Sequence, residues 1–241
     1  MSRIRLLVSV RDAAEAAAAV TAGADIVDLK EPAGGALAPV GLAELEGAMA
    51  AVAGRTPVSA VVAELPGPAE IVEAMIHGAA CRGAATLKIG AARPALTADD
   101  LRVVSLAAST GCEVVVVFYA EAMPGHLALE AAAAAGAAGV MLDTRTKDGR
   151  TLLDVAPAAA VAAFVDAARS AGLFTGLAGS LTIGVLDAVA RYAPDIVGMR
   201  GGLCLDNDRR NGLDPARVRT ARALLAARPD ATAPAQDVVP A

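Results

Sequence analysis

The sequence predicts an α/β protein that folds as a single (β/α)8 barrel of the TIM type, and three observations support this fold class. Short β-branched runs alternate with longer alanine-rich stretches, which implies a parallel sheet with helical crossovers. Eight strand–helix units of roughly 25 residues fill the 241 residues, close to the length of a typical barrel of this kind. No GxGxxG motif follows the first strand, which disfavours an open doubly wound sheet.

Each strand is expected where apolar and β-branched residues cluster. In chain order the strands cover Ile4–Val10, Ile26–Lys30, Val58–Val62, Thr86–Ile89, Glu113–Phe118, Gly139–Asp143, Phe174–Ala178 and Ile196–Arg200. The alanine-rich helices follow near residues 11–22, 41–53, 68–82, 97–110, 126–137, 156–171, 181–193 and 214–227. Start signals support two of them, because Asp99 and Asp100 fall in one first turn and Asp214-Pro215 opens the last helix.

These elements predict one catalytic barrel domain over residues 1–228. The remaining segment, residues 229–241, carries Pro229, Pro234 and Pro240 and has no apolar period. A segment of this composition lacks the apolar surface needed to form a packed core, so a disordered tail is expected there.

Charge and hydropathy exclude two classes of protein. The formal net charge is −5, whereas a nucleic-acid-binding protein shows a basic excess, so no nucleic-acid partner is expected. The mean hydropathy is high at +0.53, but the most uniform apolar stretch, Ala131–Leu142, is shorter than the roughly 18 residues of a membrane span. The apolar run at Ile4–Val10 is too short for a signal peptide, so a cytoplasmic protein without membrane association is expected.

Neither a metal site nor a cofactor is expected. The cysteines Cys81, Cys112 and Cys204 form no CxxC pair and are odd in number, which argues against a disulfide framework and a structural zinc site. Only two histidines are present, His77 and His126, and both are expected to be ordinary surface or boundary residues.

The lysines are unusual in number and position. Of the 21 basic residues 18 are arginines, and the only lysines are Lys30, Lys88 and Lys147. Arginine stays protonated at any working pH, whereas a desolvated lysine can lose its proton and act as a base or form an imine. Three lysines kept in a chain that otherwise uses arginine therefore point to amine chemistry.

Strand alternation brings these lysines together with two carboxylates. Barrel strands place alternate residues inside the barrel, so Asp28 and Lys30 point inward if their apolar neighbours face the helices. The same pattern points Lys88 and Asp143 inward, and Lys147 follows in the loop after the sixth strand. All five lie at or near the carboxyl ends of even-numbered strands, where barrel enzymes build their active sites.

A lysine within such a cluster suits Schiff-base chemistry on a carbonyl compound. A free amine has a pKa of roughly 10.4, and a neighbouring cation and a dry apolar wall both lower it. The neutral amine condenses with a ketone or aldehyde, and the iminium becomes the electron sink for making or breaking a carbon–carbon bond. The alternative reading is a buried ion-pair network that only closes the top of the barrel.

Two glycine-containing loops predict a phosphate site. Gly179 and Ser180 follow the seventh strand and are expected to lead straight into a helix, and Arg200, Gly201 and Gly202 follow the eighth. Glycines let backbone N–H groups approach an anion, and a helix amino end favours negative charge. Loops after strands seven and eight are the usual phosphate site of this fold, so a small phosphorylated carbonyl compound is the expected substrate.

Five segments of the chain closely resemble the (5-formylfuran-3-yl)methyl phosphate synthase family, also called 4-(hydroxymethyl)-2-furancarboxaldehyde-phosphate synthase. The resemblance runs from about residue 4 to about residue 227, and its most specific part is the DTxxKDGxTL pattern. The segments are Asp25-Ile-Val-Asp-Leu-Lys30, Leu87-Lys88-Ile-Gly90, Met141-Leu-Asp143-Thr-Arg-Thr-Lys147-Asp-Gly149-Arg-Thr-Leu152, Leu177-Ala-Gly-Ser180 and Asp195-Ile-Val-Gly-Met-Arg200-Gly.

The resemblance implies a lyase that condenses two molecules of glyceraldehyde 3-phosphate into a phosphorylated furan aldehyde, an early step toward a methanofuran-type cofactor. It implies that Lys30 is the Schiff-base lysine and Lys88 the proton acceptor. Asp28, Asp143 and Lys147 match the remaining charged positions of the family's site. The chain departs from the family pattern after Lys30, where it reads Glu31-Pro, and after the third strand, where it reads Ala63-Glu64.

Two other functions remain open alternatives at this point. A metal-dependent barrel aldolase could hold Mg²⁺ on Asp28, Glu64 and Asp143, although lysines beside the cation argue against it. A noncatalytic sensor of a sugar phosphate would keep the glycine loops but would not need Lys30. The oligomeric state is also open, because the alanine-rich helix faces suit either a homo-oligomer interface or tight packing within one chain.

Overall fold

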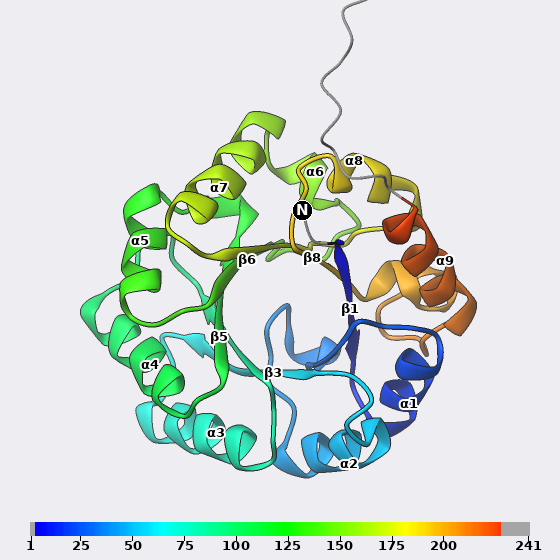
Figure 1. The fold of residues 1–241 in the computed structure, drawn as a ribbon, viewed down its shortest axis with the longest axis horizontal. Helices are drawn as coiled ribbons and strands as arrows, with labels where there is room; N and C mark the ends of the chain where they lie inside the picture. The colour runs from blue at the N-terminus through cyan, green and yellow to red at the C-terminus, as the bar shows by residue number, and fades with distance from the viewer. Residues whose placement is uncertain (1–2, 228–241) are drawn as a thin grey trace, which may run out of the picture.

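The computed structural model describes residues 3–227 and confirms the predicted barrel. Eight parallel strands pair in chain order, and the eighth pairs with the first to close the sheet. Seen along the barrel axis, the helices form a ring around the strands (Figure 1). The predicted tail, residues 229–241, lies outside the described residues.

The strands occupy the predicted places, with differences mainly at their carboxyl ends. Their bounds are β1 Arg5–Val10, β2 Ile26–Leu29, β3 Val58–Leu65, β4 Thr86–Ala91, β5 Glu113–Tyr119, β6 Gly139–Asp143, β7 Phe174–Leu177 and β8 Ile196–Met199. The largest difference is in β3, which is three residues longer than predicted. Its register against β4 shifts between Val61 and Ala63, as in a β-bulge.

The α-helices lie between the strands and cover the outside of the barrel. Their bounds are α1 Ala13–Thr21, α2 Leu42–Val52, α3 Ala69–Cys81, α4 Ala98–Ser109, α5 His126–Ala134, α6 Leu152–Val155, α7 Ala158–Ser170, α8 Leu186–Ala190 and α9 Pro215–Ala226. Short 3₁₀ turns are η1 Pro32–Gly34, η2 Ala120–Ala122, η3 Ile183–Val185, η4 Gly201–Leu203 and η5 Leu205–Asn207. Thr97 and Asp100 form a reciprocal capping box at α4, and Asp214 caps α9.

Two predicted helices differ from the structure. The segment near 156–171 is preceded by a separate turn, α6, because Pro157 lacks the N–H needed to continue a helix from it. The expectation that Ser180 leads straight into a helix is wrong. Ser180 has a left-handed φ of 48°, η3 begins only at Ile183, and α8 has five residues. The β-branched and glycine residues of this segment have low helix propensity, which accounts for the break.

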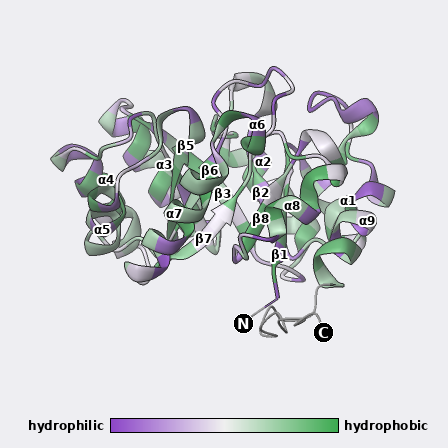
Figure 2. Cartoon of the chain, turned by 90° about the horizontal axis from the view of Figure 1, so that it is seen from above, coloured by the Kyte–Doolittle hydropathy of each residue, from purple (hydrophilic) through white to green (hydrophobic). Residues whose placement is uncertain are grey.

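Apolar side chains form an inner and an outer core. The outer core fills the space between strands and helices, while the inner core fills the barrel and includes Leu7, Ile26, Val61, Val115 and Met141. Figure 2 shows hydrophobic residues along the strands and hydrophilic residues mainly in the loops and on the rim. The alternation predicted from the sequence therefore determines which side chains enter the barrel.

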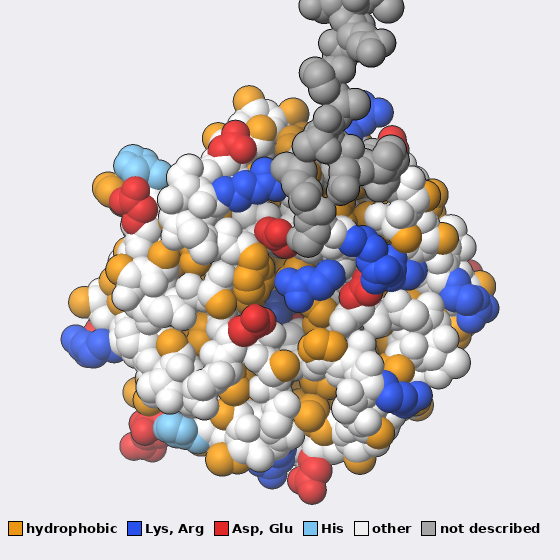
Figure 3. All heavy atoms as spheres, in the orientation of Figure 1, with side chains coloured by type: hydrophobic (Ala, Val, Ile, Leu, Met, Phe, Trp, Pro, Cys, Tyr) orange, Lys and Arg blue, Asp and Glu red, His pale blue; other side chains and the backbone are white. Residues whose placement is uncertain are grey.

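The surface carries dispersed apolar side chains. On the face shown in Figure 3, hydrophobic side chains are scattered, and acidic and basic side chains lie both near its centre and around its edge. Within residues 3–227, no helix combines the length and the apolarity that a membrane crossing requires.

Candidate active site

A cavity of about 880 Å³ lies at the carboxyl ends of the strands and contains most of the predicted site residues. The loops after β2, β6, β7 and β8 contribute to its lining. The predicted residues that line it are Lys30, Lys88, Asp143, Lys147, Gly179, Ser180, Arg200, Gly201 and Gly202. Asp28 is not among the lining residues; it is completely buried beneath Lys88, with which it forms an ion pair.

Asp28 is the centre of a buried hydrogen-bond network. Lys88 Nζ donates to both of its oxygens at 3.1 Å, and the hydroxyls of Ser9 and Ser59 donate at 2.9 and 2.6 Å. Burial raises the pKa of Asp28, but Lys88, Lys30 and the hydrogen bonds together outweigh burial and lower it. Asp28 is therefore a carboxylate that holds the Lys88 side chain in place.

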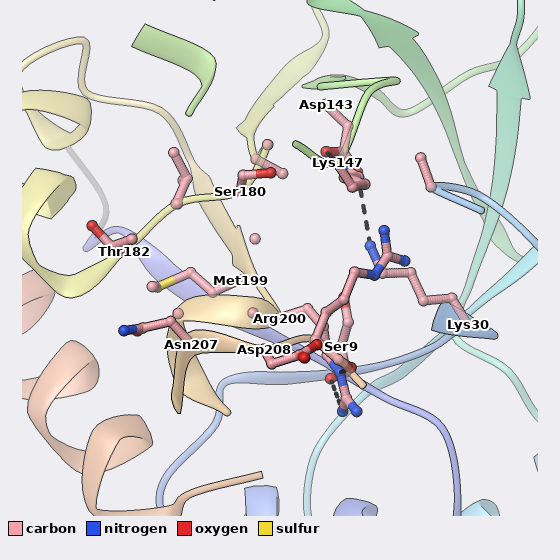
Figure 4. A pocket seen from close by; sticks show the side chains of 18 of the residues that line it. Ser9, Lys30, Asp143, Lys147, Ser180, Thr182, Met199, Arg200, Asn207 and Asp208 are labelled. Atoms are coloured by element: carbon pink, nitrogen blue, oxygen red, sulfur yellow. Dashed lines mark hydrogen bonds and ion pairs between the residues drawn. The ribbon is translucent and has the colours of Figure 1, made fainter. Parts of the chain in front are cut away.

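Lys30 is almost fully buried, and its contact with a carboxylate is longer than the contact between Lys88 and Asp28. Its Nζ lies 3.8 Å from Asp143 Oδ2, and Figure 4 shows the two side chains pointing toward one another. Burial lowers the pKa of Lys30 from 10.5 to about 8, with Lys88 and Lys147 acting in the same direction and Asp143 and Asp28 opposing. At pH 7 this raises the neutral fraction from fewer than one in about 10³ to about one in ten.

Asp143 bridges two lysines at the end of β6. Lys147 Nζ donates to Asp143 Oδ1 at 2.7 Å and to Thr144 Oγ1 at 3.1 Å, and the Thr144 backbone N–H donates to the same Asp143 oxygen. Burial raises the pKa of Asp143, but Lys147 and Lys30 overcome this effect and lower the pKa to about 2. Asp143 thus stays ionised and orients both amines toward the cavity.

The glycine loops after β7 and β8 lie against each other. A Cβ at Gly202 would come within 2.3 Å of the Leu181 carbonyl oxygen, so only glycine permits this approach. Gly179 has a φ of +112°, and a Cβ there would lie 2.8 Å from Thr144 Cγ2. The structure therefore brings together the two loops that the sequence predicts as a phosphate site.

Arg200 is engaged by the protein itself. Its Nη1 contacts Glu15 Oε2 and the Ser9 carbonyl, its Nη2 contacts Glu15 Oε1 and the Asn211 carbonyl, and its Nε contacts the Arg209 carbonyl. A guanidinium has five N–H donors, and all five are used here. The geometry therefore assigns the Arg200 side chain to holding the loop after β8 rather than to binding an anion.

Several residues of this site were not predicted. Ser9 and Ser59 could have been found from the sequence, because each is a polar residue at an inward position of an otherwise apolar strand. In the structure both are paired in register with Asp28. Glu15 lies on α1, which the sequence suggests only as an outer helix. Arg209 also lines the cavity, and its position in a long loop gives no periodic signal.

Each of the carboxylates considered for Mg²⁺ is paired with a basic side chain. Asp28 contacts Lys88, Asp143 contacts Lys147, and Glu64 Oε1 lies 3.6 Å from Arg145 Nη1. Among residues 3–227 no group of three or more histidine, cysteine, aspartate or glutamate side chains is arranged to hold a metal ion.

Comparisons with known proteins identify relatives along almost the whole chain. Residues 6–222 match the family described as 4-HFC-P synthase. A protein of Methylorubrum extorquens, named as a candidate (5-formylfuran-3-yl)methyl phosphate synthase, is 41% identical over 96% of each chain. The (5-formylfuran-3-yl)methyl phosphate synthase of Methanocaldococcus jannaschii is 35% identical over 86% of this chain and 93% of the relative.

Solved structures support the same fold at much lower identity. Phosphoribosyl anthranilate isomerase of Thermus thermophilus has a TM-score of 0.65 at 16% identity, covering 92% of this chain and 98% of that chain. A 3-hexulose-6-phosphate synthase of Salmonella typhimurium has a TM-score of 0.66 at 16% identity, with the same coverage. At this identity the likeness concerns the barrel architecture alone.

Proposed function

The chain belongs to the 4-HFC-P synthase family, and from this premise we propose that it condenses two molecules of glyceraldehyde 3-phosphate into (5-formylfuran-3-yl)methyl phosphate. The observation that carries the proposal is Lys30, an almost fully buried amine at the open end of the barrel, beside Asp143. The product would serve a methanofuran-type cofactor pathway.

The first step is imine formation on Lys30. Its neutral Nζ attacks the carbonyl carbon of one phosphorylated triose, and the carbinolamine loses water to give an iminium. Desolvation favours the neutral amine that this attack requires. The Lys147–Asp143 pair beside it can donate and accept the protons of carbinolamine formation and dehydration.

The second step forms the carbon–carbon bond. Loss of a proton from the carbon beside the iminium gives an enamine, whose carbon attacks the aldehyde carbon of the second triose phosphate. Lys88 lines the cavity and is the proposed base: its neutral amine accepts this proton, and the ammonium that results is paired with Asp28 beneath it. The same pair can protonate the new alkoxide.

The remaining steps close and aromatise the ring without any change in oxidation state. Two molecules of glyceraldehyde 3-phosphate contain the atoms of the furan product plus two waters and one phosphate. The enzyme is thus proposed to be a lyase of the Schiff-base aldolase type, needing no redox partner. One phosphate is expected to bind to the backbone N–H groups of the glycine loops after β7 and β8.

Reductive trapping tests the proposal directly. Borohydride added together with glyceraldehyde 3-phosphate is expected to fix substrate mass irreversibly on the peptide that contains Lys30, because it reduces the iminium to a stable amine. Mass spectrometry of a digest gives both the mass and the site. Label found only on Lys88 or Lys147, or no label during active turnover, would contradict the assignment.

The lowered pKa of Lys30 predicts a specific pH profile. The neutral amine is the reactive form, so kcat/KM should rise about tenfold per pH unit on the acid side of the Lys30 pKa. It should level off above that pKa, which is about 8. Initial rates measured between pH 6 and 10 check this expectation. If kcat/KM continued to rise up to the ordinary lysine pKa, the pKa of Lys30 would not be lowered in solution.

A further inference from the structure

The cations that line the cavity differ in whether the protein neutralises them. Six have a carboxylate oxygen within 4 Å, and these are Lys30, Lys88, Lys147, Arg145, Arg200 and Arg210. Arg209 is the cavity-lining cation that has no such partner within residues 3–227. A guanidinium that faces the cavity without a counter-ion can accept an anionic group without breaking an existing ion pair.

The geometry of Arg209 leaves most of its donors available. Its Nη2 donates to the Gly35 carbonyl at 2.7 Å, whereas its buried Nε has no hydrogen-bond acceptor among the described residues. Burial lowers the pKa of Arg209, whereas the negative charge of Asp143 raises it. A guanidinium nevertheless remains charged at any working pH. Arg209 thus uses one donor, in contrast with the five that Arg200 uses.

The position of Arg209 connects two walls of the cavity. Its backbone lies in the loop after β8. A Cβ built on Gly201 would lie 3.7 Å from the Cβ of Arg209. Its guanidinium reaches the loop after β2 at Gly35, five residues beyond Lys30. The side chain therefore extends from the loop after β8 to the loop that follows Lys30.

We propose that Arg209 binds the phosphate of one of the two substrate molecules, so that the cavity has a second phosphate site besides the glycine loops after β7 and β8. This inference rests on the proposed function, since joining two triose phosphates places two dianions in one cavity. A guanidinium suits this task because its donors match two phosphate oxygens in a bidentate pair.

The number of bound phosphates tests the second site without requiring turnover. Glycerol 3-phosphate carries the same phosphate and has no carbonyl, so calorimetric titration counts phosphate sites alone. The wild-type chain is expected to bind two equivalents and Arg209→Gln one. Arg210→Gln is the matched control and is expected to bind two, because Arg210 is exposed and paired with Asp208 at 2.6 Å.

Kinetics give an independent measurement. Arg209→Gln should raise KM for glyceraldehyde 3-phosphate about tenfold or more, since it removes a charge-assisted contact, and Arg209→Lys should recover part of this loss. Borohydride trapping of unphosphorylated glyceraldehyde on Lys30 should be equal in wild type and Arg209→Gln. A general disturbance of the site would instead reduce trapping as well.

The two proposals can fail separately. Two bound equivalents in Arg209→Gln, one in the wild type, or an unchanged KM in Arg209→Gln would each overturn the second phosphate site while furan formation continued. A wild-type chain that binds two equivalents but forms no furan product would overturn the proposed reaction and retain the site.

Discussion

Replacing Lys30 by arginine is expected to lower product formation by at least about 10³-fold, the largest kinetic effect that the structure predicts. Arginine keeps a positive charge near Asp143 but stays protonated and forms no imine. The variant should also show no substrate mass after borohydride treatment. Product formation and mass spectrometry measure these two expectations.

The control for Lys30→Arg is the integrity of the site. The variant should retain its melting temperature to within a few degrees and should bind glycerol 3-phosphate as the wild type does, because the glycine loops and Arg209 are unchanged. Turnover near the wild-type rate would mean that the reaction does not pass through an imine on Lys30. The noncatalytic sensor considered from the sequence would show ligand binding in both proteins and turnover in neither.

Replacing Lys88 by alanine is expected to lower kcat at least about a hundredfold, because it removes the proposed proton carrier from the cavity wall. The same change leaves Asp28 as a completely buried carboxylate held only by the hydroxyls of Ser9 and Ser59. Breaking a buried ion pair by removing one partner costs about 3–5 kcal/mol, so the free energy of unfolding should fall by this order while the fold persists. Denaturant unfolding measures this loss.

A double variant separates the two effects of Lys88. Lys88→Met with Asp28→Asn removes both charges and preserves much of the side-chain volume, so most of the lost stability should return. Activity should remain low, because neither member of the proton-carrying pair is present. Near-normal turnover in Lys88→Ala would remove the proposed role of Lys88 as the proton carrier.

The barrel could be predicted from the sequence because its signals are local. Strand β6 has the same bounds in the prediction and the structure, since Gly139–Asp143 is a short apolar run between clear boundaries. The break between Ser180 and η3 could not be predicted in this way, because the weak helix propensity of Thr182, Ile183 and Gly184 leaves the conformation of this segment to tertiary contacts.

Part of the candidate site could also be predicted from alternation alone. The inward parity of Asp28, Lys88 and Asp143 follows from the pleat of the strands, and the structure places all three inside the barrel end. Arg200 has the same parity, yet its guanidinium pairs with Glu15 on α1. Strand alternation predicts on which side of the sheet a side chain begins. It does not predict which residue the far end of a long side chain contacts.

By itself, the sequence determined a closed eight-stranded barrel and gathered three lysines and two aspartates at one end, because strand period and strand order are properties of the chain. Only the tertiary structure decided which charges neutralise one another. It paired Lys88 with Asp28 and Lys147 with Asp143, and it left Arg209 without a carboxylate among the described residues. Ion pairing depends on distances of a few ångströms between residues far apart in sequence, and no local pattern contains those distances.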